Sequence, residues 1–427
     1  MKLSRTLHHL KAVTAALLLA AVSVPASTGG ADGKKIEFTT KSKEAKEYVA
    51  QIVKRIESFQ FGPDLNALAK KAAEADPEFA FAHYLVGTTS ASPAEAKPHI
   101  DKSVELAKKA SEAERRYIEA VLYARTQKPA EALAIFTGLG KQYPEERMVQ
   151  MMIGQVCMNM GRLDEAKAAL ERAIQIDGST PRAYTFIGNV YLLKGDYAKA
   201  REYFKTSLGK APKDSAPFGP NYGLAYSYVY EGDIKSALKT LEAYQAEYDR
   251  SAAQQNFPAV FIWNSIGRLY LERGQPEEAL KAYEKGYATI PGSNLSEVEK
   301  KTWLGRLHHG KGRALAKLGK HEEAWKEAEL IKKMIEENGK EGEAFWPSYH
   351  YIAGYLKLEA GDYNKAIEHL KQTDLNDPFH KLLLARAYEK SGDEANAQKL
   401  YKEIVSFNVI NLERALSYPE AKKKLKG

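Results

Sequence analysis

The most regular feature of the chain is a helical spacing of apolar residues. Residues 186–204 read FIGNVYLLKGDYAKAREYF, and apolar side chains recur three or four positions apart on both sides of Gly195. This spacing gathers the apolar side chains on one face of a helix. The stretch therefore predicts two amphipathic helices joined by a short turn at the glycine.

The same pattern recurs along the chain, which indicates an internal repeat. A pair of one apolar and one small residue precedes most of the turn glycines by seven or eight positions, an alanine follows each by five, and a large apolar residue usually comes four positions later. The glycines lie 34, 37, 42, 45, 42 and 31 residues apart, a period typical of stacked repeats. They are Gly161, Gly195, Gly232, Gly274, Gly319, Gly361 and Gly392.

Each recurring position has a mechanical reason. Gly195 suits the left-handed conformation that ends a helix, and Asp196 can cap the helix that follows. The small residues Gly188 and Ala200 allow the two helix axes to approach closely, and Phe204 then fills the space against the next unit. The capping acid recurs at Asp233, Asp362 and Asp393.

The pattern resembles the tetratricopeptide repeat, a helix-turn-helix unit of 34 residues. Residues 181–214 match nearly every signature position, and residues 260–293 match almost as well. Looser units begin near 147, 218, 305, 347 and 378, and degenerate ones near 46, 80 and 113. The resemblance implies an all-α, right-handed superhelical solenoid of about ten helix-turn-helix repeats.

The first 26 residues are predicted to form a cleavable export signal. Three basic residues are followed by the apolar run AVTAALLLAAVSV and then by small residues, and the run is too short to span a bilayer. We expect cleavage after Ala26, with Ala31 as an alternative, and a periplasmic or extracellular location. A retained signal that anchors a membrane-tethered scaffold is the competing hypothesis. No cysteine follows the apolar run, which disfavours a lipid-anchored lipoprotein.

The remaining chain divides into four predicted parts. Residues 27–40 are expected to be a flexible linker, 41–146 degenerate repeats, 147–407 the main solenoid, and 408–427 a capping helix with a basic tail. Spacing between turn glycines increases from Gly195 to Gly361, where SAAQQNFPA, SNLSEVEKK and GKEGEAF are added. Such additions predict either loops on a binding face or longer helices without a binding role.

Charge and cysteine content narrow the possible partners. The net charge is +8; it falls to +5 without the signal, and to about +1 without Lys422, Lys423, Lys424 and Lys426 as well. A nearly neutral body lacks the basic face that nucleic acid requires, so we expect no nucleic-acid partner. The single Cys157 cannot form an internal disulfide. No later stretch is apolar enough to cross a membrane, so we expect no stable membrane insertion after cleavage.

Motifs of catalysis are missing from the sequence. It contains no phosphate-binding G-x-x-x-x-G-K-[ST] loop, no G-x-S-x-G elbow and no H-E-x-x-H pair. His308, His309, His321 and His350 come nearest to a metal cluster, but adjacent histidines of a helix point in different directions. We therefore predict a protein that is not an enzyme and has no metal or cofactor.

The resemblance also implies a binding groove lined by the first helices of successive repeats. The residues at its groove positions are aromatic, amide or basic, with no acid among them. Tyrosine offers apolar area with a polar tip, and arginine pairs with carboxylates. The lysine-asparagine carboxylate clamp of the family is missing, which disfavours a chaperone-tail ligand. The predicted groove residues are Asn189, Tyr222, Tyr226, Asn264, Arg268, His309, Arg313, Tyr351 and Tyr355.

These observations predict a non-catalytic scaffold for protein-protein interaction. The groove, centred on residues 181–360, would bind a peptide or a partner-protein segment, with an acidic segment as one candidate. The alternative is a cell-envelope enzyme or small-ligand-binding protein that uses a pocket formed by the insertions between repeats.

Overall fold

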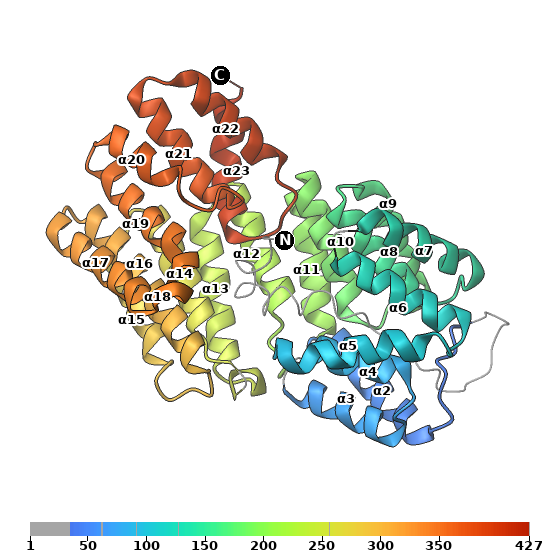
Figure 1. The fold of residues 1–427 in the computed structure, drawn as a ribbon. Helices are drawn as coiled ribbons and strands as arrows, with labels where there is room; N and C mark the ends of the chain where they lie inside the picture. The colour runs from blue at the N-terminus through green and yellow to red at the C-terminus, as the bar shows by residue number, and fades with distance from the viewer. Residues whose placement is uncertain (1–34, 61–62, 91, 127, 256, 427) are drawn as a thin grey trace. The chain divides into compact units, whose positions relative to one another are not determined.

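The computed structural model describes residues 35–60, 63–90, 92–126, 128–255 and 257–426, and within them it contains helices and no strands (Figure 1). The predicted export signal and linker residues 27–34 lie outside the described residues. The chain divides into two compact units, here called the N-terminal unit, which ends at Gly223, and the C-terminal unit, which begins at Leu224. The boundary falls inside helix α12 (Phe218–Tyr230).

The N-terminal unit is built from five helical hairpins. Each first helix packs against the second helix of its own hairpin, and most second helices contact the first helix of the next hairpin. The pairs are α2 (Lys43–Glu57) with α3 (Pro63–Ala75), α4 (Ala80–Thr89) with α5 (Pro93–Ala107), α6 (Glu112–Arg125) with α7 (Pro129–Gln142), α8 (Arg147–Asn159) with α9 (Leu163–Ile176), and α10 (Pro181–Lys194) with α11 (Tyr197–Lys210).

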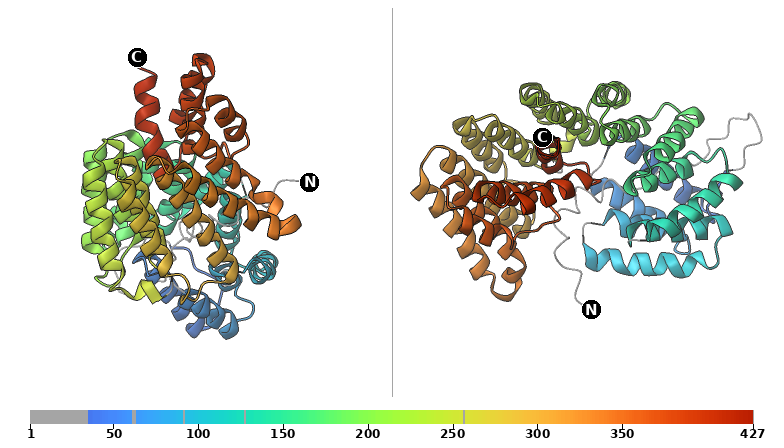
Figure 2. Two further views of the ribbon diagram at one scale, coloured as in Figure 1. Left: turned by 90° about the vertical axis from the view of Figure 1, so that its left-hand side faces the viewer. Right: turned by 90° about the horizontal axis from the view of Figure 1, so that it is seen from above.

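The C-terminal unit continues the same arrangement (Figure 2). After α12 come α13 (Ile234–Tyr248), α14 (Val260–Glu272), α15 (Pro276–Ala288), α16 (Glu297–Lys317), α17 (His321–Glu337), α19 (Trp346–Glu359), α20 (Tyr363–Leu370), α21 (Pro378–Ser391), α22 (Glu394–Ser406) and a final single helix, α23 (Leu412–Lys424). The described helices thus give ten hairpins. The prediction of an all-α chain of about ten helix-turn-helix repeats is confirmed.

The turns form as the sequence predicts. All seven turn glycines have positive φ, between 74° and 87°, a conformation that is costly for residues with a Cβ. The four predicted capping acids each accept a hydrogen bond from the backbone N–H three residues later. These contacts satisfy N–H groups that a helix leaves unpaired at its start.

In five of the hairpins, close packing depends on a glycine of the first helix opposite a large side chain of the second. A Cβ added to Gly188 in α10 would lie 2.6 Å from the ring of Phe204 in α11, and one added to Gly223 would lie 2.3 Å from the same ring. The ring of Phe204 is therefore enclosed from two sides. Tyr283 is held in the same way between Gly267 and Gly310.

The added segments mostly lengthen helices or form short ones. SNLSEVEKK supplies the cap and first turns of α16, where Ser296 and Glu299 form a reciprocal capping box. GKEGEAF forms α18 (Gly339–Gly342) and the 3-10 turn η3 (Glu343–Phe345), and SAAQQNFPA contains η2 (Ala252–Gln255). The sequence left open whether the added segments form loops on a binding face or longer helices. For SNLSEVEKK, the structure shows a longer helix, α16.

We predict that Gly188→Ala lowers the stability of the N-terminal unit by about 1–3 kcal/mol, because the ring of Phe204 has no space to move away from the new methyl group. Urea unfolding followed by circular dichroism measures the effect.

Gly209→Ala is the matched control, because no atom lies within 4 Å of its added Cβ and alanine favours a helix by about 1 kcal/mol. Equal midpoints for the two variants would contradict the packing argument.

Candidate functional site

The predicted groove residues lie on first helices, but most of their side chains are buried. Tyr222 and Asn189 belong to the N-terminal unit, and the other seven belong to the C-terminal unit, so they do not make up one site within a unit. Asn264 and His309 are half-buried. The buried ones are Asn189, Tyr222, Tyr226, Arg268, Arg313, Tyr351 and Tyr355.

Arg313 is held by its own unit. Its Nη1 donates to the hydroxyl of Tyr351 at 2.9 Å, and Nη2 donates to the hydroxyl of Tyr283 at 3.4 Å. The guanidinium is 5% exposed and lies over the ring of Tyr351. Burial and the charge of Arg313 keep the pKa of neighbouring His309 well below its ordinary value. In this part of the predicted groove, His309, Arg313 and Tyr351 therefore contact one another inside the fold.

Arg268 is buried too, but it is less completely paired. Its guanidinium lies 3.8 Å from the ring centroid of Phe379, and its Nε lies 3.6 Å from Glu272. Nε and Nη2 have no hydrogen-bond partner among the described residues. Burial opposes the charge of Arg268, yet Tyr351, Glu272 and Glu413 raise the pKa of the guanidinium above its ordinary value.

The start of the C-terminal helix, α23, contacts the first helix α12 of the same unit. We use the term first-helix face for the side of a unit that is lined by the first helices of its hairpins. At the start of α23, Arg414 donates to the hydroxyl of Tyr230 at 2.6 Å. Burial and the charge of Asp377 raise the pKa of Glu413, and the charges of Arg268 and Arg306 oppose that rise. The role of Arg414 could not be predicted from the sequence, because Tyr230 lies 184 positions away along the chain.

Residues 35–40 lie on the first-helix face of the N-terminal unit. In residues 35–40, exposed and more buried side chains alternate as they do in an extended strand. Ile36 N–H donates to Glu146 at 3.2 Å, and Thr39 N–H donates to Glu114 at 2.6 Å. Residues 35–40 therefore do not behave as the flexible linker predicted for 27–40. Burial of Ile36 and Phe38 holds them on the unit, and their alternation with polar residues is the signal that could have predicted it.

Glu114 joins this segment to the fold. Its other oxygen accepts from Phe81 N–H at 3.2 Å, so one buried carboxylate binds two segments of backbone. Burial raises the pKa of Glu114, and the hydrogen bonds from Thr39 and Phe81 oppose that rise. Ser111 completes the contact, since its N–H donates to Thr39 Oγ1 at 2.8 Å and its hydroxyl donates to the Glu37 carbonyl at 3.2 Å.

Two aromatic rings of the unit contact Phe38, the aromatic residue of segment 35–40. The ring of Phe38 lies 4.3 Å from that of Phe81 and 6.2 Å from that of Tyr117, the second contact being edge-on. Phe81 and Tyr117 are fully buried. Offset and edge-on ring pairs add about 0.5–1.5 kcal/mol to the burial of area. The face thus offers carboxylates for a backbone and a pocket for an aromatic side chain.

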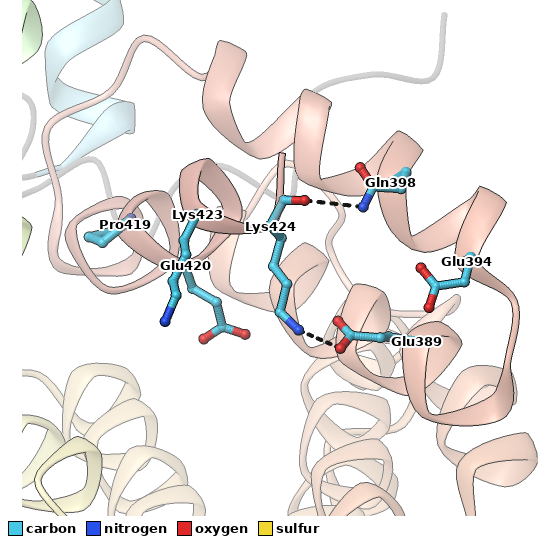
Figure 3. A pocket seen from close by; sticks show the side chains of 7 residues that line it. All are labelled: Glu389, Glu394, Gln398, Pro419, Glu420, Lys423 and Lys424. Carbon is cyan, nitrogen blue, oxygen red and sulfur yellow. Dashed lines mark hydrogen bonds and ion pairs between the residues drawn. The ribbon is translucent and has the colours of Figure 1, made fainter. Parts of the chain in front are cut away.

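A surface pocket of about 750 Å³ lies between α22 and α23 (Figure 3). Polar groups of its lining bind one another. Lys424 pairs with Glu389, and the side chain of Gln398 donates to the Lys424 carbonyl at 3.2 Å. None of the predicted groove residues lines it. The arrangement fixes α23 to the last hairpin and shows no nucleophile with an activating base.

The histidines singled out by the sequence do not converge. His308 bonds Glu327 at 2.5 Å, His309 bonds Ser348 at 2.6 Å, and His350 pairs with His369. Within the described part of the chain, no three metal-binding side chains come together. Also within that part, no helix is both long and apolar enough to cross a membrane.

Two histidine pairs occupy equivalent places in different hairpins. The Nδ1 atoms of His83 and His99 are 2.9 Å apart, and those of His350 and His369 are 3.0 Å apart. In each pair, one histidine lies four residues before a packing glycine, and the other lies directly before the side chain that packs on that glycine. The hairpin of α10 and α11 has Tyr184 and Tyr203 at these two positions. Burial and repulsion from the partner ring lower the pKa of His350.

Two stretches of the chain match a known protein family. Two family profiles, both described as tetratricopeptide repeat, match residues 145–213 and 222–294. The protein carries tetratricopeptide repeats. The first match spans α8 to α11, and the second spans most of α12 and all of α13 to α15. They include the two best units predicted from the sequence. Tetratricopeptide repeats generally mediate protein-protein interaction.

Similar proteins share only parts of their length with this tetratricopeptide-repeat chain. It is 26% identical over 174 residues to the human protein O-mannosyl-transferase TMTC1, covering 41% of this chain and 19% of that protein. It is 26% identical over 144 residues to the general transcriptional corepressor trfA of Dictyostelium discoideum, covering 34% of this chain and 10% of that protein. The chain thus spans less than a fifth of either relative.

Solved structures resemble the fold at low identity. One is a tetratricopeptide repeat protein from Parabacteroides merdae ATCC 43184, with 14% identity, a TM-score of 0.46, and coverage of 64% of this chain and 98% of that one. Another is the APC/C hetero-tetramer Cut9-Hcn1, with 13% identity, a TM-score of 0.46, and coverage of 85% of this chain and 63% of that one.

We predict that the histidine pairs make the fold sensitive to acid. Burial lowers the pKa of His350 and His369 in the fold, so between the folded and unfolded pKa values the unfolded chain binds more protons. Stability is therefore present above about pH 6.5 and falls as the pH drops below it. Lys357 also disfavours the charged form of His369, whereas Glu368 favours it.

His350→Tyr with His369→Tyr, the residues of the α10–α11 hairpin, should reduce the fall in melting temperature between about pH 7.5 and about pH 5.5. The exposed His321→Gln is the control and should leave that fall unchanged. An unaltered pH dependence in the double variant would contradict the assignment.

Proposed function

We propose that this protein is an exported, non-catalytic scaffold whose first-helix faces bind segments of partner proteins. The observation that carries the proposal is the way in which the N-terminal unit binds residues 35–40 of its own chain. That segment lies on the first helices α4 and α6 and the start of α8, where a partner segment would lie. The export signal predicted for residues 1–26 supports a partner in the periplasm or outside the cell.

The contacts to the segment have the properties of peptide recognition. Glu114 and Glu146 bind backbone N–H groups, which every residue except proline offers, so they fix the direction and register of a chain more than its sequence. The pocket of Phe81 and Tyr117 selects an aromatic side chain. Alternate backbone and pocket contacts are the means by which extended peptides are bound with both affinity and selectivity.

Rigidity of the face favours binding. Glu114 is held by the backbone of Phe81, and the two aromatic rings are packed within the unit, so little conformational entropy is lost when a segment binds. In the C-terminal unit, buried Arg268 has two nitrogens without a hydrogen-bond partner among the described residues, which favours a segment that carries a carboxylate. The alternative of an enzyme or small-ligand protein has less support, since the pocket beside α23 is lined by none of the predicted groove residues and its Lys424 is already paired with Glu389.

The proposal is tested with a labelled peptide of residues 35–41, KIEFTTK, and the full chain carrying Ile36→Ala and Phe38→Ala. The two substitutions remove the apolar anchors of the internal segment, each worth about 1.5–3 kcal/mol when buried. We expect the variant to bind the peptide at least about tenfold more tightly than the unmodified chain, measured by fluorescence anisotropy.

Glu37→Ala is the matched control, because its side chain is exposed and its carbonyl contact to Ser111 is kept. Adding Glu114→Gln to the double variant should weaken binding about fivefold, because a neutral acceptor gives about 1 kcal/mol less than a charged one. No binding of the peptide by the double variant, with its helix content intact, would refute the proposed function.

A further inference from the structure

The last helix of the chain stands apart from the hairpins. α23 has no partner helix of its own and packs against α21 and α22. Asn411 caps its start by accepting from Arg414 N–H at 2.8 Å, and residues 407–411 connect it to α22 without helical structure. Its end is fixed by charge pairs: Arg386 donates two hydrogen bonds to Glu420, at 2.9 and 2.6 Å.

The first turns of α23 lie on the first-helix face of the C-terminal unit. Arg414 is 5% exposed, donates to the hydroxyl of Tyr230 in α12, and also donates to the Phe407 carbonyl at 2.7 Å. Its guanidinium lies over two rings, 5.4 Å from that of Tyr230 and 4.5 Å from that of Tyr418. A planar cation between aromatic faces is a specific contact that a lysine or an apolar residue would not reproduce.

Glu413 directly precedes Arg414 at the start of α23. Burial and the charge of Asp377 raise the pKa of Glu413, and the charges of Arg268 in α14 and Arg306 in α16 oppose that rise. Arg268 is itself buried, and its Nε and Nη2 have no hydrogen-bond partner among the described residues. Arg306 stacks on Trp303 at 4.7 Å. The face thus offers Arg268 for an acid and Tyr230 for the arginine that follows it.

Much of what holds α23 is polar. Its fully buried apolar side chains are the small Ala415 and Ala421, with Leu412 as the larger anchor. Pro419 inside the helix removes one backbone hydrogen bond. Burial of charged side chains costs desolvation energy that offsets much of their attraction. Because polar groups supply much of the contact, a helix that offers the same groups in the same order can compete with α23 for this place.

We propose that α23 is an internal ligand of the C-terminal unit and that this first-helix face binds an amphipathic helix of a partner that carries a leucine, an acid and an arginine in the order of Leu412, Glu413 and Arg414. The partner helix takes the place of α23, and Tyr230 with Arg268 and Arg306 binds its charged pair. This inference rests on the proposed function, since it assigns the ligand class of one first-helix face.

The test uses a labelled peptide of residues 407–426 and the full chain. Arg414→Ala in the chain removes the hydrogen bond and the cation–π contact from α23 to Tyr230 but leaves every residue of the receiving face unchanged. We expect this variant to bind the peptide at least about tenfold more tightly than the unmodified chain, measured by fluorescence anisotropy. The same peptide carrying Arg414→Ala should bind at least about tenfold more weakly than the unmodified peptide.

Lys423→Ala in the chain is the matched control, because that side chain is exposed on the same helix. It should bind the peptide no better than the unmodified chain. Equal affinity of the Arg414→Ala and Lys423→Ala chains would overturn the proposal, and so would dimerisation of the Arg414→Ala chain in place of peptide binding, since the occupant would then be a second copy.

Hydrogen exchange of the unmodified chain gives a second measurement that does not depend on a variant. Amides of α23 should exchange at least about tenfold faster than those of α21 and α22, because α23 leaves the face without unfolding of the hairpin. Exchange of all three helices at one rate would overturn the proposal. Failure here leaves the peptide test of the N-terminal unit unaffected, because that test uses another face and another peptide.

Discussion

In five hairpins, a large side chain of the second helix lies against a glycine of the first, closer than a Cβ would allow. Phe204 against Gly188 and Tyr283 against Gly267 are the aromatic cases. This contact fixes the distance between the two helices, and the ring then reaches the next first helix at Gly223 or Gly310. Because protein interiors are densely packed, one ring thereby sets the spacing both within a hairpin and between hairpins. The rows of first helices, and hence the faces they present, depend on it.

The faces so formed carry more polar side chains than a simple packing surface requires. Glu114 and Glu146 in the N-terminal unit and Arg268 and Arg313 in the C-terminal unit are all buried on first helices or at their starts. Buried charges need partners. Ile36 and Thr39 supply them to Glu146 and Glu114 in one unit, and Tyr351 and Tyr283 supply them to Arg313 in the other, where Arg414 of α23 bonds Tyr230. Each unit is thus observed with a segment of its own chain where the proposed function places a partner segment.

Much of the fold was predictable because its rules are local. Gly195 and Asp196 are adjacent, Gly188 and Phe204 are 16 positions apart, and their roles follow from helical spacing alone. The turn glycines, the capping acids and the number of hairpins were therefore predicted correctly. The candidate site was predicted less well, because a position on a first helix does not say whether another segment covers it. Arg313 satisfies the groove pattern, yet it donates to Tyr351 and Tyr283 inside the unit.

The sequence by itself determined the repeat, its turns and its helix pairs, since these depend on residues close together in the chain. Only the tertiary structure decided which groove side chains are accessible. The contact of Ile36 with Glu146 joins residues 110 positions apart, and that of Arg414 with Tyr230 joins residues 184 positions apart. No period in the sequence encodes such contacts. They form because assembled hairpins gather polar groups on one face, and these groups bind whichever segment the stacked helices bring within reach.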